Sequence, residues 1–489
     1  MPQSMSGAEN TAKMQVGEYT LKLLLGFLTG AAVAAFGIPT EGIVIGGLLA
    51  IIWVQYFKQI KLVMLCLAGG AFIFGILYFH LYAQGSVTFL RLPQDSPATF
   101  EGLVVEEPRN ANRFARFTIE LQEPYRGKIG VIDEASGIQY GDVLRLEGRI
   151  RIENGEIIAK FPKTERLARN KGHWLKEQLL AVKRGVIQSF ERALPPDEAA
   201  LLSGITLGAR SSFSPKLKED MAISGTIHIV AVSGYNISIL AIVLGSAAAL
   251  FMRRRIAIWV AVIGILLFVG IVGSEASVVR AAIMGILGLL AEGTGRPNNQ
   301  AYAIALAASL MVAWDPTIIR NDLGFMLSFL SLLGVTYLSP ALQSLWRNAK
   351  DKGFFAWKEN LDTTLGAQLG VLPVLLLTFG SVSATSLLAN ILIIPLIPIT
   401  MGVGFLLGII QWLSPLLAFP VTEIARLLTG YEIWVIQFFA DTAIPIGNFF
   451  AYPVVIIAYY LFFAAFIAYR NKKGEIKLTE PSAIKNLWS

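Results

Sequence analysis

Residues 363–422 limit the possible folds more than any other part of the chain, because sixty consecutive positions hold no Asp, Glu, Lys, Arg or His. One helical crossing of a bilayer needs about 20 apolar residues, so this stretch is long enough for at least two crossings. Pro373, Pro395 and Pro398 fall inside it, and each removes a helix hydrogen bond. In lipid the freed carbonyls must be satisfied by protein or by a wet cavity. The stretch therefore predicts membrane helices with interruptions.

The composition places the whole chain in this class. Of its 489 residues, 54% are hydrophobic and only 15% are charged, which is too apolar for soluble domains of this length. Further apolar runs lie near residues 21–37, 42–56 and 61–83, after a polar N-terminus that is unlike a signal peptide. Basic residues mark cytoplasmic loops, and this rule predicts a polytopic α-helical protein of the cytoplasmic membrane, with about 12 spans and both termini cytoplasmic.

Residues 84–169 interrupt the apolar pattern after the third run and are therefore expected on the extracytoplasmic side. Short runs rich in β-branched and aromatic residues alternate there with Asn, Gly, Pro and Asp, a pattern typical of strands and turns. Five such runs suit a small all-β barrel of the OB type. OB folds often bind single-stranded nucleic acid through basic grooves and aromatic side chains.

The charges of this insert balance, since 13 basic residues face 13 acidic ones. A DNA-binding groove would thus depend on local clusters of basic residues. The candidates are Arg109, Arg113 and Arg116 beside Phe114 and Phe117, and Arg145, Arg149 and Arg151. Ordinary solvated faces are the alternative explanation.

The remaining chain is expected to form four parts. Residues 1–83 hold the N-terminal spans, and residues 170–225 mix Trp, Leu and Ile with Lys and Arg as amphipathic interfacial helices do. Residues 226–470 form the main set of transmembrane segments. Residues 471–489 are a cytoplasmic tail.

Polar side chains within residues 226–470 are the candidate functional groups, because a polar group in a span usually faces protein or water. The run TIHIVAVSGYNISIL at 226–240 either shares one helix face among its polar residues or breaks the helix at Ser-Gly. The residues expected to line a pore are His228, Ser233, Gly234, Asn236, Arg280, Gln368 and Asn390. A buried cluster that only packs spans together is the other explanation, with Arg280 bound to a carboxylate such as Asp322 or to a carbonyl.

Four ordered motifs resemble the ComEC family of competence proteins. HIVAVSGYN at 228–236 is similar to the HLLAVSGLH-type signature, although Tyr235 and Asn236 replace an apolar residue and His. SVVRAAIM at 277–284 resembles SVxRAxIM. DPTIIRNDLGFMLSF at 315–329 resembles DPxxLxDxGFQLSF, with Met326 in place of Gln. The run from Ala367 to Asn390 resembles AQLxxLPxxxxxFGxxSxxxxLAN.

This resemblance implies a channel that carries single-stranded DNA across the cytoplasmic membrane during natural transformation, with an OB-like domain after the first spans. The implied partners are single-stranded DNA, membrane lipids and other competence proteins: a DNA receptor, a cytoplasmic motor and a separate nuclease. Many members carry a C-terminal metallo-β-lactamase-like domain. Here the three histidines, His80, His173 and His228, form no HxHxDH cluster. We therefore expect no enzyme activity, no metal and no cofactor.

Two other classes stay open from the residues alone. Interrupted spans could form the midplane site of a small-solute or ion transporter. An intramembrane enzyme using Ser233, His228 and Asn236 ranks last, because no second base is in view for Ser233.

Overall fold

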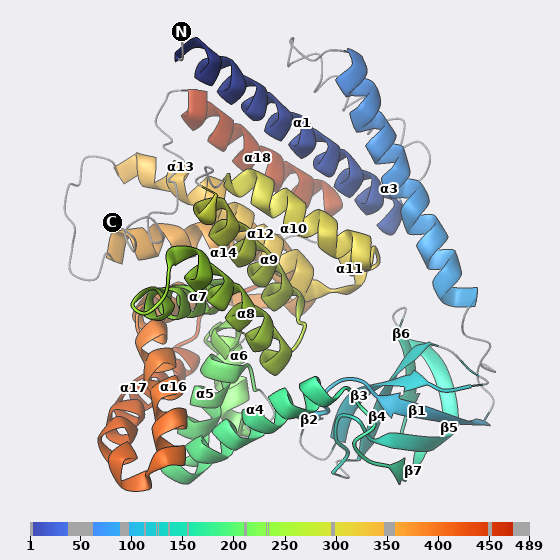
Figure 1. The fold of residues 1–489 in the computed structure, drawn as a ribbon, viewed down its shortest axis with the longest axis vertical. Coiled ribbons are helices and arrows are strands. Elements are labelled where there is room, and N and C mark those ends of the chain that lie inside the picture. Colours follow the sequence, from blue (N-terminus) through green and yellow to red (C-terminus); the bar gives the residue numbers. More distant parts are fainter. Residues whose placement is uncertain are drawn as a thin grey trace. The chain divides into compact units, whose positions relative to one another are not determined.

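The protein is described by a computed structural model (Figure 1). It covers residues 3–37, 62–88, 97–111, 114–123, 125, 127–134, 137–153, 156–209, 213–230, 232, 234–294, 299–346, 357–447 and 452–472. Two compact units divide the chain, Met1–Gly172 with Gly295–Met326, and His173–Thr294 with Leu327–Ser489. The first unit thus includes a segment that the sequence places among the main transmembrane segments. The expected apolar run at 42–56 lies outside the described residues.

Four of the described helices lie wholly within the first unit. They are α1 (Gln3–Ala35), α3 (Leu62–Thr88), α10 (Gln300–Trp314) and α11 (Ile318–Asn321). α1 packs along α3 and also against α10 and α11. The first pair is close because Gly30 has no side chain: a Cβ there would stand 2.0 Å from the carbonyl oxygen of Phe72. The hydroxyl of Tyr78 on α3 donates a hydrogen bond of 2.6 Å to the carbonyl of Ala313. Backbone contact and a hydrogen bond therefore hold these helices together.

A small β-barrel completes the first unit. Its strands are β1 (Pro97–Val104), β2 (Arg109–Ala111), β3 (Phe114–Leu121), β4 (Lys128–Glu134), β5 (Val143–Glu153), β6 (Glu156–Lys160) and β7 (Lys163–Ala168). The order β1-β3-β4-β6-β5 closes on itself through a β1–β5 pairing, and only β4 and β6 run parallel within this ring. Alternate residues such as Ile119, Val131 and Leu146 fill the interior. The predicted β-barrel is confirmed, and its five-stranded ring fits the OB class.

The second unit is helical. Its first half holds α4 (Trp174–Ala193), α5 (Pro196–Leu207), α6 (Pro215–Ile223), the 3-10 turn η1 (Ile227–Val230), α7 (Gly234–Ala249), α8 (Arg254–Val272) and α9 (Ala276–Gly293). The sequence places α5 among amphipathic interfacial helices, but the structure buries every residue from Ala199 to Leu207. The reason is its composition, because nothing after Glu198 in α5 is charged. α5 is therefore a core helix.

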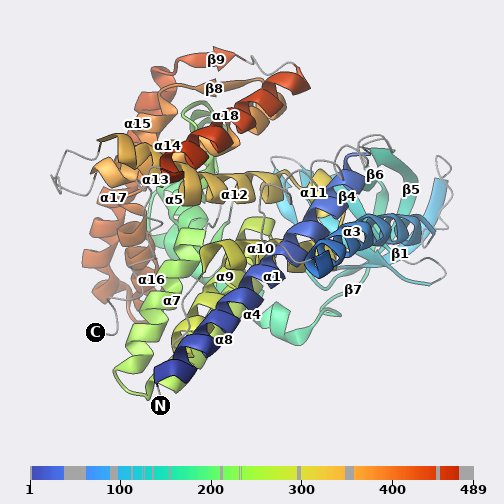
Figure 2. The same ribbon diagram turned by 90° about the horizontal axis from the view of Figure 1, so that it is seen from above.

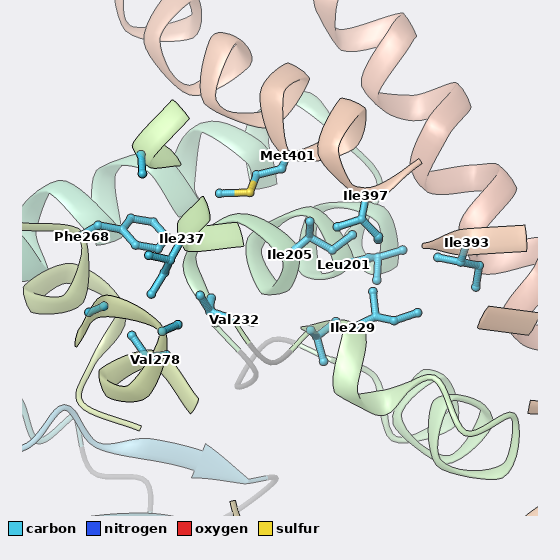
Figure 3. Packing of buried hydrophobic residues seen from close by; sticks show 14 of the residues in the cluster. Leu201, Ile205, Ile229, Val232, Ile237, Phe268, Val278, Ile393, Ile397 and Met401 are labelled. Atoms are coloured by element: carbon cyan, nitrogen blue, oxygen red, sulfur yellow. The ribbon is translucent and has the colours of Figure 1, made fainter. Parts of the chain in front are cut away.

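The second half of this unit continues from α12 (Leu323–Leu333), which begins in the first unit. It comprises the π-helix η2 (Gly334–Leu338), α13 (Ser339–Gln343), η3 (Ser344–Trp346), α14 (Trp357–Phe379), β8 (Ser381–Ser383), α15 (Ser386–Ile393), α16 (Ile397–Leu413), α17 (Pro415–Asp441), β9 (Pro445–Gly447) and α18 (Pro453–Lys472). β8 and β9 pair antiparallel, as Figure 2 shows from above. Residues of α5, α7, α9, α15 and α16 meet in one apolar core (Figure 3).

Several helices are suited to a membrane. Four of the described helices are long and apolar enough to cross one: Arg254–Val272, Leu323–Gln343, Leu361–Phe379 and Val454–Lys472. A fifth span is possible if α15 and α16, which bend by 50° at their junction, count as one. The junction holds Pro395, and Pro398 lies just inside α16, so the expected interruption by proline is confirmed here. The chain is a helical membrane protein with an N-terminal β-barrel.

Pro373 lies inside α14, and its effect on the helix is compensated by another helix. Proline lacks an N–H, so the carbonyl four residues earlier, that of Leu369, loses its partner. The hydroxyl of Tyr459 on α18 donates to this carbonyl at 2.7 Å. Its neighbour Tyr460 donates to the Gly370 carbonyl at 3.1 Å, which the N–H of Val374 can already reach within the helix. Protein, and not a cavity, satisfies the freed carbonyl.

Tyr459→Phe should therefore destabilise the protein more than Tyr460→Phe. Only the first change leaves a partly buried carbonyl unpaired, at a cost of about 1 kcal/mol or more. Thermal unfolding of the purified protein in detergent measures the difference. In a Pro373→Ala background the restored N–H should remove it, so an equal penalty for Tyr459→Phe in both backgrounds would contradict this explanation.

Candidate functional site

The run at 226–240 is broken and not one continuous helix. η1 ends at Val230, and α7 starts at Gly234. The turn before η1 uses Gly225 with a positive φ of 70°, a conformation that favours glycine. Asn236, in the first turn of α7, is buried and donates from Nδ2 to the carbonyl of Ile205 at 3.2 Å. This bond ties the start of α7 to α5, while Ser233 lies outside the described residues.

Arg280 on α9 lies beside the broken segment. Its Nη1 donates to the carbonyl of Ser328 on α12 at 2.6 Å, and its guanidinium carbon is 5.8 Å from the centre of the Phe329 ring. A Cβ added to Gly234 would stand 3.5 Å from its Nη2. One turn earlier on α9, the hydroxyl of Ser277 donates to the carbonyl of Val232 at 3.2 Å.

The Arg280 side chain is buried, and its Nε has no hydrogen-bond partner among the described atoms. The acceptor of Nη1 is a carbonyl, the second of the two acceptors considered from the sequence. Asp322 instead accepts from the N–H of Phe325 at 2.9 Å, as the residue that caps the start of a helix does. Arg280 thus keeps a full positive charge without a carboxylate in its recorded contacts.

A second polar group surrounds Ser386 at the start of α15. Nε2 of Gln368 lies 3.4 Å from the Ser386 hydroxyl, and a Cβ on Gly225 would stand 2.6 Å from the Ser386 Cβ. The ring of His228 hydrogen-bonds to the backbone of Gly225. Asn390, one turn after Ser386, is buried, and its Oδ1 has no partner among the described atoms.

The candidate residues therefore fall into two groups along one broken segment. Gly234 and Arg280 lie together at the start of α7. His228 and Gln368 lie near the beginning of the segment, where Gly225 contacts Ser386. Asn236 bonds toward α5. Whether these residues line a path stays a prediction.

Sequence analysis did not single out Glu432. It sits at the centre of α17 with no exposed surface, and its Oε1 accepts a 2.6 Å hydrogen bond from Thr400 on α16. A signal was present in the spacing: Ala425, Thr429, Glu432 and Ile436 follow the three-to-four residue period of one helix face, and all four are buried. An acid in an apolar stripe of this kind marks a position worth testing.

On the barrel, the basic candidates differ in their surroundings. Arg145 pairs with Glu101 at 2.8 Å and with Glu165 at 3.6 Å, and the hydrogen bond that it donates to Glu101 raises the pKa of its guanidinium. Exposed pairs of this kind contribute little to stability, but here they compensate the charge. Arg116, Arg149 and Arg151 are exposed.

The first basic cluster gathers on the β2–β3 hairpin. Arg109 stands opposite Arg116 in the pairing of the two strands, and Arg113 lies outside the described residues. Phe117 belongs to the barrel core, so its expected role as an aromatic platform is wrong: odd-numbered positions of β3 face inward. Phe114 is exposed, and its ring packs edge-on against that of Phe161 at 5.1 Å. This exposed aromatic pair is the better platform.

Comparison with known proteins identifies the family of this chain. The family profile described as "Competence protein" matches residues 205–473, more than half of the chain. The chain belongs to the competence protein family. The curated relative "ComE operon protein 3" of Bacillus subtilis (strain 168) is 24% identical over 372 residues, which cover 68% of this chain and 45% of that protein. The chain thus spans less than half the length of this relative. No solved structure matches.

Most candidate residues of this competence protein lie inside the matched region. Both polar groups and Glu432 fall within residues 205–473, whereas the barrel precedes the matched region. In the described part of the chain, no group of three or more His, Cys, Asp or Glu side chains could hold a metal ion.

Proposed function

We propose that this competence protein forms a channel for single-stranded DNA across the cytoplasmic membrane during natural transformation. The observation that carries the proposal is the family match over residues 205–473, which contain the broken segment and Arg280. A sliding polyanion needs a polar path that attracts phosphates without holding them. One buried arginine beside the side-chain-free Gly234, with amide and hydroxyl groups nearby, has that character. His228, Ser233, Asn236, Gln368 and Asn390 would supply the neutral groups.

Under this proposal the barrel receives DNA before it enters the membrane. Arg109, Arg113 and Arg116 would bind phosphates, and Phe114 would stack on bases. Arg149 and Arg151 would add a second basic strip, and Arg145 would contribute less because Glu101 already compensates its charge. DNA would arrive from a receptor and be drawn in by a cytoplasmic motor. A separate enzyme would degrade the other strand.

Transformation with labelled single-stranded DNA tests the proposal. A strain that lacks this gene should bind DNA at its surface but fail to accumulate it in the cytoplasm, and the intact gene should restore accumulation. Normal accumulation in the deletion strain would exclude the channel function. The runner-up is a small-solute transporter, which the 50° bend between α15 and α16 favours. Such a strain would then transform normally.

The proposed topology has about twelve spans, with the barrel outside and both termini inside. Cysteines introduced at Gly137 and Gly474, in a background with Cys66 replaced, should therefore react from opposite faces with an impermeant thiol reagent. Gly137 is exposed and an added side chain would meet nothing within 4 Å, although its positive φ of 68° favours glycine. Labelling of both from the same face would contradict this arrangement.

A further inference from the structure

Glu432 is an acid enclosed by apolar side chains. Its neighbours on the buried stripe of α17, Val435 and Ile436, belong to the same apolar core as Ile397 and Met401 of α16. Thr400 donates to Oε1, but Oε2 is buried and has no hydrogen-bond partner among the described atoms. An ionised carboxylate at such a place would lack the several donors that a buried charge requires. The neutral acid, which carries a proton on Oε2, is the form that fits.

A metal ion or sodium ion fits the surroundings less well. Hard cations take about six oxygen ligands, and the recorded polar contact of Glu432 is the single hydroxyl of Thr400. No cluster of acidic side chains able to hold a metal occurs in the described ranges. The proton is therefore the ligand whose needs this site meets.

A second carboxyl lies beside the same buried face of α17. Glu198, at the start of α5, is half-buried and hydrogen-bonds to the side chain of Thr429. Thr429 lies one turn before Glu432 on the same buried face of α17. Oε2 of Glu198 is also buried without a hydrogen-bond partner. The Thr429 hydroxyl itself donates to the carbonyl of Ala425 at 2.8 Å.

The charged groups near α17 come from two of the helices packed against it. α5 presents Glu198, with Arg426 and Glu423 of α17 beside it, and α6 presents Asp220 near Asp441 at the end of α17. α15 and α16 present Asn390 and Thr400, which do not titrate. Arg426 is not recorded in an ion pair with Glu432.

The hydrogen-bond partner of Glu432 connects the site to the bend. Thr400 lies one turn into α16, directly after the 50° break that separates it from α15. Loss of the proton would place a charge in the core and strengthen the hold of the carboxylate on the Thr400 hydroxyl. A change of protonation would thus act on the first turn of α16.

We propose that Glu432 is a proton-binding site, and that binding and release of its proton sets the position of the α15–α16 bend during transport. The second clause rests on the proposed transport function, and the first does not.

Infrared spectroscopy of the purified full-length protein tests the proton directly. In the spectrum of the wild-type protein minus that of Glu432→Gln, we expect the C=O stretch of a protonated carboxyl group at neutral pH, shifted when H2O is replaced by D2O. Glu198→Gln serves as the matched control and should retain this band. Carboxylate bands in place of the carboxylic acid band would show that Glu432 is ionised and would overturn the proposal. Equal unfolding midpoints confirm that the variants are folded.

Transformation as a function of external pH tests the coupling. Glu432→Gln keeps the acceptor for Thr400 but cannot release a proton, so uptake of DNA should lose its dependence on pH. Thr400→Val should shift the pH profile while the infrared band persists. A Glu432→Gln strain with the wild-type pH profile would overturn the coupling. If the infrared band is present but deletion of the gene leaves DNA uptake unchanged, the transport function fails while the proton site stands.

Discussion

Replacement of Arg280 by alanine is expected to abolish most DNA uptake while the protein remains in the membrane. Arg280 is the only basic residue of α9, and its charge is not shared with a carboxylate in the recorded contacts. A hydrogen bond from a charged donor is worth about 1.5–3 kcal/mol. Loss of that interaction with a passing phosphate corresponds to roughly 10- to 100-fold lower transport. Transformation frequency, normalised to the amount of protein in membrane fractions, measures the effect.

Two variants separate charge from structure. Arg280→Lys should retain part of the activity, because a sliding phosphate needs the charge more than the two-pronged geometry of arginine. Arg192→Ala removes an exposed positive charge from α4 and should leave uptake unchanged. Arg280 also has a structural role, because its hydrogen bond to the carbonyl of Ser328 holds α9 against α12. If both the Arg280→Ala and the Arg280→Lys proteins disappear from the membrane, the role of Arg280 is structural only.

The β-barrel could be predicted from sequence because its five ring strands alternate inward and outward residues. The two strands that sequence reasoning missed do not alternate apolar and polar side chains. β7 carries Lys163, Glu165 and Arg166, and none of its residues is fully buried. β2 has three residues and pairs only with β3. Pairing along an edge depends on backbone hydrogen bonds, which leave little trace in side-chain periodicity.

The polar site was only half predictable, for a related reason. A single arginine in an apolar helix, such as Arg280, indicates that its charge needs a hydrogen-bond partner. That partner is the backbone carbonyl of Ser328, and because every residue has a carbonyl, the sequence does not identify it. Pro373 likewise shows which carbonyl is freed without showing that Tyr459, far along the chain, satisfies it. The sequence shows that a buried polar group needs a hydrogen-bond partner, but only the packing of the helices shows which group is that partner.

Gly334→Ala is expected to cost about 3 kcal/mol or more, enough to deplete the folded protein. Gly334 opens the π-helix η2 where it crosses α14, and an added Cβ would stand 2.1 Å from the carbonyl oxygen of Gly366. Neither partner is a flexible side chain, so the two helices would have to separate. Gly370 meets the carbonyl of Leu330 in the same crossing, with a Cβ position 2.6 Å away. The spacing Gly366-x-x-x-Gly370 is typical of close membrane helix pairs.

Gly402→Ala is the matched control, since Gly402 lies within α16 and a Cβ there would meet nothing within 4 Å. Alanine favours a helix by about 1 kcal/mol over glycine, so this variant should be as stable as the wild type or more so. Unfolding midpoints and membrane levels compare the two.

The crossing also matters for Arg280, because Ser328 and Phe329 precede Gly334 on the same continuous run of helix. A separation that moves this run would move the carbonyl that holds the arginine. Gly334→Ala protein that still inserts should therefore lose DNA uptake as Arg280→Ala does, and a stable, fully active variant would show that the two helices do not need to touch.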